Sequence, residues 1–337
     1  MTSPQRLTAI VVTYNRLEAL QTTLARLLAH DAKTLSKLIV CNNASTDGTD
    51  AYLATLKDPR LTVLTLPTNT GGAGGFEAAL RHAEATEPSD WYVLMDDDAF
   101  PDTGALARFH AAPRDDHDVW LSAVRYPNGR ICEMNKPWRN PFWSVSVFAA
   151  SLLKGRSAFH IGPQDYAQKQ PLDVDGGSFV GQFISRRAIS KAGFPRGELF
   201  IYADDVLFTL AVRQAGGRVG FDPRIAFVHD CETLSESDML ISPLWKVYFY
   251  HRNVTLVYRK VAGPVLFWPL IALKAVSWHK RARLYGAERP LYLRLLKLAL
   301  SDALGKRVRY TAADIKALIS PQEHADDSGA KAPDQTP

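Results

Sequence analysis

The chain has 337 residues, of which 46% are hydrophobic and 22% are charged, and its formal net charge is +5. This composition is ordinary for a globular protein and excludes a chain that is disordered throughout. The length suits one large α/β domain with an appendage, and three cysteines without paired spacing argue against a disulfide framework and for a reducing cytosol. Residues 1–6 lead directly into an apolar run, so we expect no secretion signal and a cytoplasmic location.

Apolar runs alternate with helical patterns through the first hundred or so residues. The predicted strands are Leu7–Thr13, Lys37–Cys41, Leu61–Leu66 and Trp91–Met95, and the predicted helices are Arg16–Ala29, Asp50–Leu56 and Gly75–Glu84. This alternation predicts a Rossmann-like α/β fold, with a mostly parallel central sheet flanked by helices. In such a sheet, ligands bind at the carboxyl ends of the strands.

The second half of the chain is less regular. Residues 125–175 are rich in Trp and Pro, which predicts an irregular excursion. The elements predicted after it are a strand at Phe179–Ser185, helices at Arg187–Ala192 and Ala203–Ala215, and a strand at Arg218–Phe227. We therefore expect a catalytic domain at 1–242, a basic, amphipathic helical region at 243–320 and a disordered tail at 321–337.

Three aspartates follow the predicted strand Trp91–Met95 directly. Adjacent carboxylates at the end of a buried strand repel one another, and a divalent cation would relieve that repulsion. In extended backbone Asp96 and Asp98 point the same way and would share one Mg²⁺ or Mn²⁺, while Asp97 would face a ribose hydroxyl. The alternative is a solvated acidic turn or a helix N-terminal cluster.

Two further polar segments follow strand ends. Residues 69–76 combine a turn with glycines that expose backbone amides at the mouth of a helix, where a diphosphate would bind. A plain glycine-rich loop is the alternative. Residues 42–47 carry amide and carboxylate groups suited to a base and a ribose, or else form an ordinary Asx-rich turn.

Two acids and a histidine later in the chain add to this set. Asp204 and Asp205 begin a predicted helix, and one ionised carboxylate there would take a proton from an acceptor hydroxyl. A pair of acids that only caps the helix is the alternative. His229 lies just beyond a predicted strand and is either a third ligand to the same metal or a structural residue.

The order of these motifs resembles glycosyltransferase family 2, over roughly residues 7 to 260. The segments that carry the resemblance are Val11-Val12-Thr13-Tyr14-Asn15-Arg16, Asn43-Ala44-Ser45-Thr46-Asp47-Gly48-Thr49, Asn69 with its glycines, Asp96-Asp97-Asp98, Gly193-Phe194-Pro195 leading to Phe200-Ile201-Tyr202-Ala203-Asp204-Asp205, Val228-His229 and Tyr250-His251-Arg252-Asn253. The resemblance implies a GT-A fold, a divalent metal and an inverting single displacement on a nucleoside-diphosphate sugar.

The resemblance also implies roles for individual residues. Asp96 and Asp98 would bind the metal, His229 would complete its site, and Asp205 would be the general base with Asp204 beside it. The residues implied to bind the nucleotide sugar are Thr13, Tyr14, Asn15, Asn42, Asp47, Asn69, Gly74 and Asp97. The family usually has an aspartate where this chain has Asn42, although an amide oxygen can still accept a hydrogen bond.

The donor sugar is also suggested by resemblance. The segment 69–76 is similar to that of the galactofuranosyltransferase branch, whose members use UDP-galactofuranose to build cell-surface polysaccharide, and the Arg252-Asn253 segment agrees. We therefore expect transfer of galactofuranose to a hydroxyl of a lipid-linked or cell-surface glycan. A rhamnosyltransferase that uses dTDP-rhamnose is the alternative within the family.

The C-terminal third is strongly basic. Between residues 245 and 310 there are 14 Lys and Arg residues against two acids. Residues 261–278 are apolar, but they contain two prolines and a lysine and are short for a membrane span. We therefore predict interfacial helices that hold the enzyme on anionic lipid at the inner face of the cell membrane. A helical subdomain with solvated basic faces is the alternative.

A nucleic-acid-binding protein whose α/β domain only binds a nucleotide is the alternative from a different class. Trp268, Trp278 and Tyr285 would then stack on bases. We expect no nucleic-acid partner, because the aspartates lie at the catalytic edge and the basic stretch carries no recognised nucleic-acid motif. An inactive relative that binds a nucleotide sugar without transferring it is a third alternative, kept open by Asn42.

Overall fold

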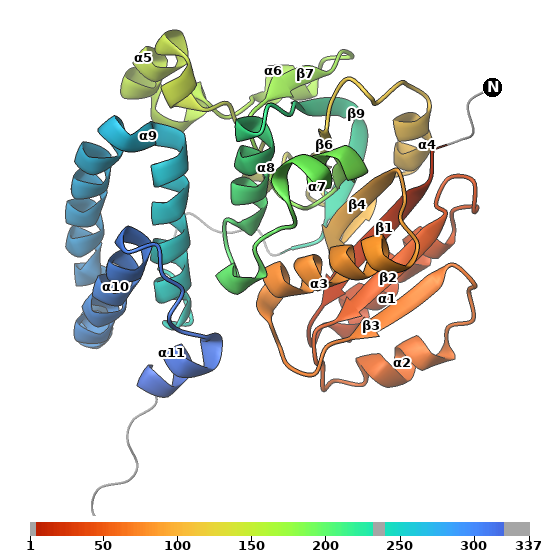
Figure 1. The fold of residues 1–337 in the computed structure, drawn as a ribbon, viewed down its shortest axis with the longest axis horizontal. Helices are drawn as coiled ribbons and strands as arrows, with labels where there is room; N and C mark the ends of the chain where they lie inside the picture. Colours follow the sequence, from red (N-terminus) through yellow and green to blue (C-terminus); the bar gives the residue numbers. More distant parts are fainter. Residues whose placement is uncertain (1–4, 232–239, 320–337) are drawn as a thin grey trace, which may run out of the picture.

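The computed structural model describes residues 5–231 and 240–319, and a nine-stranded mixed sheet forms its centre (Figure 1). The strand order is β3-β2-β1-β4-β8-β6-β9-β5, and β7 pairs with β9. The strands are β1 (Leu7–Thr13), β2 (Lys37–Asn42), β3 (Leu61–Thr65), β4 (Trp91–Asp96), β5 (Ala99–Pro101), β6 (Val119–Arg125), β7 (Leu172–Val174), β8 (Gln182–Ser185) and β9 (Val219–His229).

Helices cover both faces of this sheet and form a separate group at the C-terminal end (Figure 1). The α-helices are α1 (Leu17–Leu28), α2 (Thr49–Thr55), α3 (Gly71–Thr86), α4 (Ala105–His110), α5 (Val145–Lys154), α6 (Pro163–Tyr166), α7 (Arg186–Ala192), α8 (Asp204–Gln214), α9 (Lys246–Arg281), α10 (Arg289–Leu304) and α11 (Ala312–Ile319). The 3₁₀ turns are η1 (Glu133–Asn135), η2 (Pro141–Trp143), η3 (Gly155–Ala158), η4 (Gly197–Leu199) and η5 (Ala282–Glu288).

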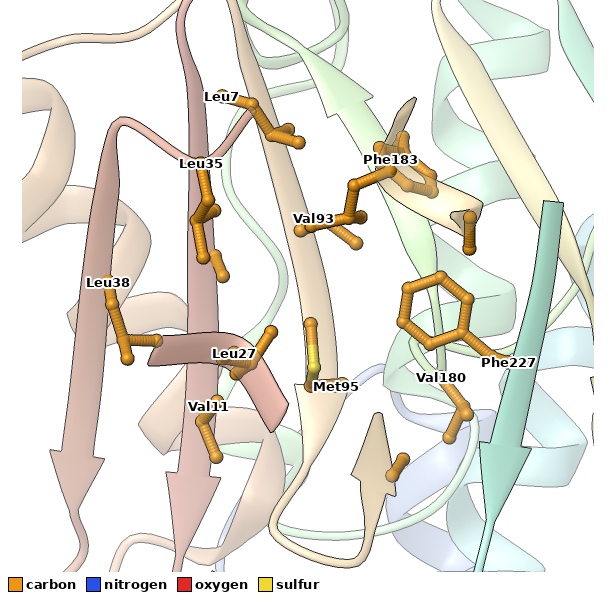
Figure 2. Close-up of a cluster of buried hydrophobic side chains, with 14 of the residues drawn as sticks. Leu7, Val11, Leu27, Leu35, Leu38, Val93, Met95, Val180, Phe183 and Phe227 are labelled. Atoms are coloured by element: carbon orange, nitrogen blue, oxygen red, sulfur yellow. The ribbon is translucent and has the colours of Figure 1, made fainter. Parts of the chain in front are cut away.

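Successive side chains of the central strands enter two different cores. Val11 of β1 packs with α1 and α4 on one face, and Val12 packs with α3 and α8 on the other. Figure 2 shows Val93 and Met95 of β4 in the first of these cores, together with Phe227 of β9. Burial on both faces explains why these strands read as continuous apolar runs in the sequence.

The predicted α/β fold is confirmed, and the sheet is parallel only in part. Strands β3, β2, β1 and β4 are parallel, whereas β8 joins β4 and β6 antiparallel, and β5 and β7 join β9 antiparallel. Strands β5 and β6 and helix α4 lie in stretches for which no element was predicted. The pairing of β5 with β9 matters most for the site, because it aligns Ala99 with His229.

Helix α3 begins at Gly71, earlier than the predicted start at Gly75. The early glycines of this helix are needed for close approach, not for flexibility. A Cβ at Gly71, where φ is +72°, would overlap the carbonyl of Phe200, and a Cβ at Gly75 would overlap the side chain of Val12. The glycines therefore let the start of α3 lie directly against β1 and against the loop before α8.

The prediction of an irregular excursion over residues 125–175 is wrong in part, because the segment contains α5, α6 and β7. Helix α5 is rich in apolar residues, but none of them is fully buried. The segment is attached to the rest of the protein by β7, which pairs with β9, and by Asn140, whose Nδ2 donates to the carbonyl of Val261 in α9 at 3.2 Å.

The C-terminal helices form a third core, in which α10 and both halves of α9 pack together. Gly263 (φ 67°, ψ 179°) interrupts α9, and Pro264 follows it without a backbone N–H to donate. His251 of the first half packs on Trp278 of the second at 4.5 Å between ring centroids. The predicted tail at 321–337 lies outside the described residues, and the domain boundary at 242/243 stays a prediction.

Candidate active site

The acidic edge of the site lies where β4 ends in the centre of the sheet. Asp96 is the last residue of β4, and Asp97 and Asp98 form the turn into β5. Because β5 pairs with β9, the backbone N–H of Asp230 donates to the carbonyl of Asp98 at 2.8 Å, and His229 lies alongside. Sheet topology therefore brings together residues that are more than a hundred positions apart.

Asp96, Asp98 and His229 form a group suited to a divalent cation. One carboxylate or imidazole atom from each lies within 4.8 Å of the others. His229 Nε2 is 3.1 Å from Asp98 Oδ1, yet this buried oxygen accepts no aligned hydrogen bond from the described residues. Two carboxylates and an imidazole are ligands that Mn²⁺ and Mg²⁺ accept, so the residues present fit the predicted metal.

Arg16 is a member of this cluster to which sequence analysis gave no role. Its Nη1 lies 2.8 Å from Asp98 Oδ2 and 3.3 Å from Asp97 Oδ1, and its side chain is 48% exposed. Arg16 is the last residue of the segment Val-Val-Thr-Tyr-Asn-Arg, which runs from the end of β1 to the start of α1. Its position directly after Asn15 could have identified it as a site residue. A half-exposed guanidinium can move away, which would open the Asp98 carboxylate to a cation.

Burial and neighbouring charges set the pKa values of the cluster. Burial raises the pKa of Asp96, and it raises the pKa of Asp97 to about 7 although Arg16 and Thr13 oppose the shift. Burial would also raise the pKa of Asp98, but His229 and Arg16 outweigh it and lower that pKa. Burial therefore favours the neutral forms of Asp96 and Asp97, whereas the positive groups beside Asp98 favour its charged form.

His229 is oriented by Asn135, a residue missed in the sequence. Asn135 Oδ1 accepts from His229 Nδ1 at 2.8 Å and from Cys132 Sγ at 2.9 Å, while Asn135 Nδ2 donates to Ser178 Oγ at 2.7 Å. An amide oxygen only accepts, so the His229 proton is held on Nδ1 and Nε2 faces Asp98. No pattern marks Asn135, which is one of several Asn and Gln residues in the segment 125–175, where no element was predicted.

Protonation of His229 opposes metal binding. Burial alone would lower the pKa of His229, but its hydrogen bond to Asp98, its contacts with the sulfurs of Cys132 and Cys231, and the charge of Asp96 raise it to about 12. An imidazole ligand must be neutral at the coordinating nitrogen, so a cation that binds here displaces the Nε2 proton. The Nδ1 proton stays on His229 and is donated to Asn135 Oδ1, so Nε2 can bind a cation without any turn of the ring.

Asp204 and Asp205 begin α8 after a loop with unusual backbone geometry. Phe200, Tyr202 and Ala203 have φ values of 68°, 69° and 62°, and each non-glycine residue in this region costs about 1–2 kcal/mol. Such conformations persist only where surrounding contacts hold them, and they concentrate at functional sites. The loop places both acids at the N-terminus of α8.

The two acids differ in burial and in pKa. Burial, together with the charges of Asp205 and Asp96, raises the pKa of Asp204 well above its ordinary value. Burial also raises the pKa of Asp205, to about 6, although a hydrogen bond from the backbone N–H of Val206 opposes this shift. The hydrogen bond from Val206 favours the ionised form of Asp205, whereas burial favours the neutral form of both acids.

The predicted nucleotide residues at the end of β1 are engaged within the site. Thr13 Oγ1 donates to Asp97 Oδ2 at 2.8 Å, so these two side chains are paired with each other. Asn15 Oδ1 accepts from the backbone N–H of Thr46 at 2.6 Å, which ties the loop after β1 to the loop after β2. Tyr14 is 43% exposed. Their contact with a nucleotide stays a prediction.

Asn42 and Asp47 lie in the loop after β2. Asn42 is fully buried, its Nδ2 donates to Asp50 Oδ1 at 2.6 Å, and its Oδ1 accepts from the N–H of Ser45. The Asp47 carboxylate accepts from the N–H of Leu17 at 2.9 Å, and so caps α1. In this structure both side chains organise the loop, and a direct contact with a base or ribose stays a prediction for each.

The glycine-rich segment is held by Asn43, which sequence analysis did not single out as a site residue. Asn43 Oδ1 accepts from the N–H of Thr70 at 2.9 Å, and its Nδ2 donates to the carbonyl of Gly71 at 2.9 Å. Asn69 Oδ1 accepts from the N–H of Gly71 at 2.8 Å, and a Cβ at Gly74 would clash with Thr70. The start of α3 is therefore fixed next to the acidic edge.

Replacing Asn135 is expected to weaken metal binding. In Asn135→Ala the His229 ring loses the acceptor that fixes its tautomer, and loss of such a partner costs about 10- to 100-fold in metal affinity. Titration calorimetry with Mn²⁺ measures this. The control is Asn128→Ala in the same segment, which removes only a turn contact to Arg130. Equal Mn²⁺ affinity in Asn135→Ala and the control would contradict the role given to Asn135.

Comparisons with known proteins agree with this geometry. The model of glycosyl transferase family 2 matches residues 8–191. Galactofuranosyltransferase GlfT1 of Mycolicibacterium smegmatis is 28% identical over 235 residues, which cover 69% of this chain and 74% of that protein. Two solved structures are similar in fold. They are the mannosyltransferase PcManGT from Pyrobaculum calidifontis with GDP-Man and Mn²⁺ (19% identity, TM-score 0.51, 94% of this chain and 80% of that chain) and S. aureus TarS 1–349 with UDP-GlcNAc (17%, 0.52, 90% and 82%). The predicted GT-A fold is therefore confirmed, and the chain belongs to glycosyl transferase family 2 and is a glycosyltransferase.

Proposed function

We propose that this glycosyltransferase is inverting and metal-dependent, and that it moves galactofuranose from UDP-galactofuranose to a hydroxyl of a lipid-linked or cell-surface glycan. The observation that carries the proposal is the convergence of a cation-binding group and an ionisable buried acid. Asp96, Asp98 and His229 meet at the end of β4, and Asp205 lies in the first turn of α8, where burial and, to a smaller extent, the charge of Asp96 raise its pKa. The residues that would bind the cation and the residue that would act as the base therefore lie at the same edge of the sheet, where they would act in one reaction.

The leaving group and the acceptor are handled by different residues. Asp96, Asp98 and His229 would hold Mn²⁺ or Mg²⁺, which would offset the negative charge that grows on the departing diphosphate. Asp205 would take the proton from the acceptor hydroxyl as that oxygen attacks the anomeric carbon from the face opposite the diphosphate. A single displacement of this kind inverts the anomeric configuration and needs no covalent intermediate.

Asp205 suits the role of base better than Asp204. A base must be ionised, and Asp204 has its pKa raised well above the ordinary range by burial and by the charge of Asp205. The pKa of Asp205 is raised only to about 6, so its carboxylate is mostly ionised at neutral pH. A raised pKa also strengthens a carboxylate as a base, provided it stays below the working pH. Asp204 would remain beside it as a protonated partner.

The choice of donor rests on similarity to a relative, and the geometry is compatible with it. GlfT1 of M. smegmatis is named as a galactofuranosyltransferase, and the match covers 69% of this chain. The solved neighbours carry GDP-Man and UDP-GlcNAc, so the fold alone does not select the base or the sugar. For this reason dTDP-rhamnose and other UDP-sugars belong in the experiment that tests the donor.

The partner surface proposed for the C-terminal helices is an anionic membrane at the cytoplasmic face. The second half of α9 exposes Val265 (79%), Trp268 (60%) and Leu273 (71%), with basic residues at 280, 281 and 283 beyond them. Among the described residues, one helical stretch, Lys246–Leu304, is long and apolar enough by length and composition to cross a membrane, and only 28% of its apolar window is buried. Interruptions at Gly263 and Gly286 favour helices that lie on the surface.

Donor identity is tested by thermal shift with Mn²⁺ and five ligands: UDP, UDP-galactofuranose, UDP-galactopyranose, UDP-glucose and dTDP-rhamnose. We expect UDP and UDP-galactofuranose to stabilise the protein, and we expect the shift to disappear in Asp98→Ala because the cation is lost. A ligand at about 100 times its Kd adds about 2.7 kcal/mol to the free energy of unfolding, which is readily measured. A response confined to dTDP-rhamnose would contradict the galactofuranose assignment.

The role of Asp205 is tested by substitution and by pH. Asp205→Asn is expected to lower kcat for transfer by about 10²–10⁴-fold with donor affinity largely intact, because only the proton acceptor is lost. In the wild type, kcat should rise with pH and level off above an inflection near 6, since the base is inactive while protonated. Retained turnover in Asp205→Asn would move the base to Asp204.

Membrane contact is tested by co-sedimentation of the full chain with vesicles that contain phosphatidylglycerol. The double variant Trp268→Ser and Leu273→Ser removes exposed apolar side chains and is expected to bind at least about tenfold more weakly. Val63→Ser is the control, because Val63 is 40% exposed on β3, away from the C-terminal helices. Equal binding of the double variant and the control would contradict this surface.

A further inference from the structure

The loop before α8 is held in place by hydrogen bonds that neighbouring helices donate to its backbone carbonyl groups. This loop, residues 198–203, has five successive carbonyls from Glu198 to Tyr202, and each accepts a hydrogen bond from another helix. The carbonyl of Phe200 accepts from the N–H of Ala73 in α3 at 3.1 Å. The other four accept from Arg252 and Asn253 of α9. Short loops rarely give every carbonyl to neighbouring elements, so the backbone path here is fixed from two sides.

Asn253 makes the larger share of these contacts. Its Nδ2 lies 3.1 Å from the carbonyl of Leu199, 2.7 Å from that of Ile201 and 3.0 Å from that of Tyr202. The side chain is fully buried, and its Oδ1 accepts from Arg252 Nε at 2.8 Å. An amide NH₂ has two hydrogens, so three carbonyls at this distance share them. Only a side chain with this donor geometry can serve all three.

Arg252 supports Asn253 at a high desolvation cost. Its guanidinium is fully buried, and burial lowers its pKa. Within the described residues it forms no salt bridge, and its Nη1 has no hydrogen-bond partner. Nη2 donates to the carbonyl of Leu199 at 2.9 Å, and the group lies over the rings of Tyr248 and Phe249. A buried cation without a carboxylate is unfavourable for stability, which argues that it serves the loop instead.

The loop that these two residues hold is the strained one. Phe200, Tyr202 and Ala203 adopt left-handed backbone conformations immediately before Asp204 and Asp205. Without the contacts to α9, the backbone would relax toward ordinary conformations, and the start of α8 would shift with it. Because Asp205 is the first-turn acid that takes the acceptor proton in the proposed mechanism, a shift of its carboxylate would misalign the proton transfer.

We propose that Asn253, fixed by Arg252, is a positioning residue that holds the 198–203 loop in its left-handed conformation and so sets the place of Asp205. Asn253 does not touch substrate in this account and acts only through the loop. The catalytic part of the inference rests on the proposed function of Asp205, whereas the holding of the loop does not.

The holding of the loop is measured by hydrogen–deuterium exchange of the full chain. In Asn253→Ala, and in Asn253→Asp, which keeps the volume but loses the N–H donors, the amides of residues 199–203 should exchange about tenfold faster. The control is Thr255→Val on the same helix. Thr255 is also fully buried, and its hydroxyl donates only to the carbonyl of His251 within α9. Exchange in the loop should stay unchanged in this control.

The positioning role is measured by steady-state kinetics of transfer with the same three variants. Displacement of a catalytic group by about 1 Å costs about a hundredfold in rate, so kcat should fall by that factor in both Asn253 variants. The KM for the donor should stay within about threefold, because Asp96, Asp98 and His229 are untouched. General destabilisation of the enzyme would not lower kcat while leaving the donor KM unchanged. Thr255→Val, which alters a buried residue of α9 without touching the loop, shows the effect of such destabilisation on kcat and KM.

Three results decide the proposal. Faster loop exchange with a fall in kcat confined to the Asn253 variants supports it. Unchanged loop exchange in Asn253→Asp overturns it, as does faster exchange with kcat equal to that of Thr255→Val. If the wild type transfers no sugar from any donor, the proposed function fails, and the exchange experiment alone then decides whether α9 holds the loop. If Asn253→Ala does not fold, Asn253→Asp carries both measurements.

Discussion

The repulsion among five carboxylates at one edge of the sheet is the constraint on which the rest of the site depends. Asp96 ends β4 and Asp97 and Asp98 form the turn after it, while Asp204 and Asp205 begin α8, where burial and, to a smaller extent, the charge of Asp96 raise the pKa of both. The positive groups that contact the cluster directly are Arg16 and His229. Burial makes this imbalance costly, and a divalent cation at Asp96, Asp98 and His229, as proposed, would offset it and would supply the charge that a diphosphate needs.

Helix α9 connects this edge to the C-terminal helices. Its first half carries Arg252 and Asn253, which hold the loop before Asp204, and its second half exposes the apolar side chains proposed to meet lipid. The catalytic domain and the basic C-terminal helices differ clearly in composition. They are in contact at the loop 198–203, where three non-glycine residues have positive φ. Helix α9 therefore belongs to both regions. Its first half carries the buried polar side chains that hold the loop before Asp204, and its second half, after Gly263, exposes apolar side chains.

Much of the fold and part of the site followed from local sequence patterns. The strands of the parallel half were predicted nearly in full, since strands buried on both faces read as apolar runs. Asp96, Asp98 and His229 come together in the structure because Asp96 ends β4, Asp98 lies in the turn after it and His229 ends β9, and metal binding by the three stays a prediction. Helix α5 was missed because it is short, none of its residues is fully buried, and it lies in a segment whose Trp and Pro content predicted irregular structure.

Other parts of the site were beyond the reach of sequence patterns. Asn135 acts through one contact with His229, and Asn253 through contacts with backbone carbonyls some fifty residues away, at separations of 51 to 54 positions. Such contacts depend on tertiary placement and leave no spacing to recognise. For Asn42 and Asp47 the sequence suggested nucleotide contacts from the residue types alone. In the folded chain their oxygens accept from the backbone of their own loop and of α1, and the nucleotide contacts stay a prediction.

The most direct test of this account is pulsed electron paramagnetic resonance of Mn²⁺ bound to the protein in the presence of UDP. The account predicts a nitrogen coupling from the imidazole of His229 and a phosphorus coupling from the diphosphate on the same ion. The nitrogen coupling should vanish in His229→Gln while the phosphorus coupling remains. A Mn²⁺ signal that shows neither coupling, or one that His229→Gln leaves unchanged, would contradict a metal site at Asp96, Asp98 and His229 that serves a nucleotide donor.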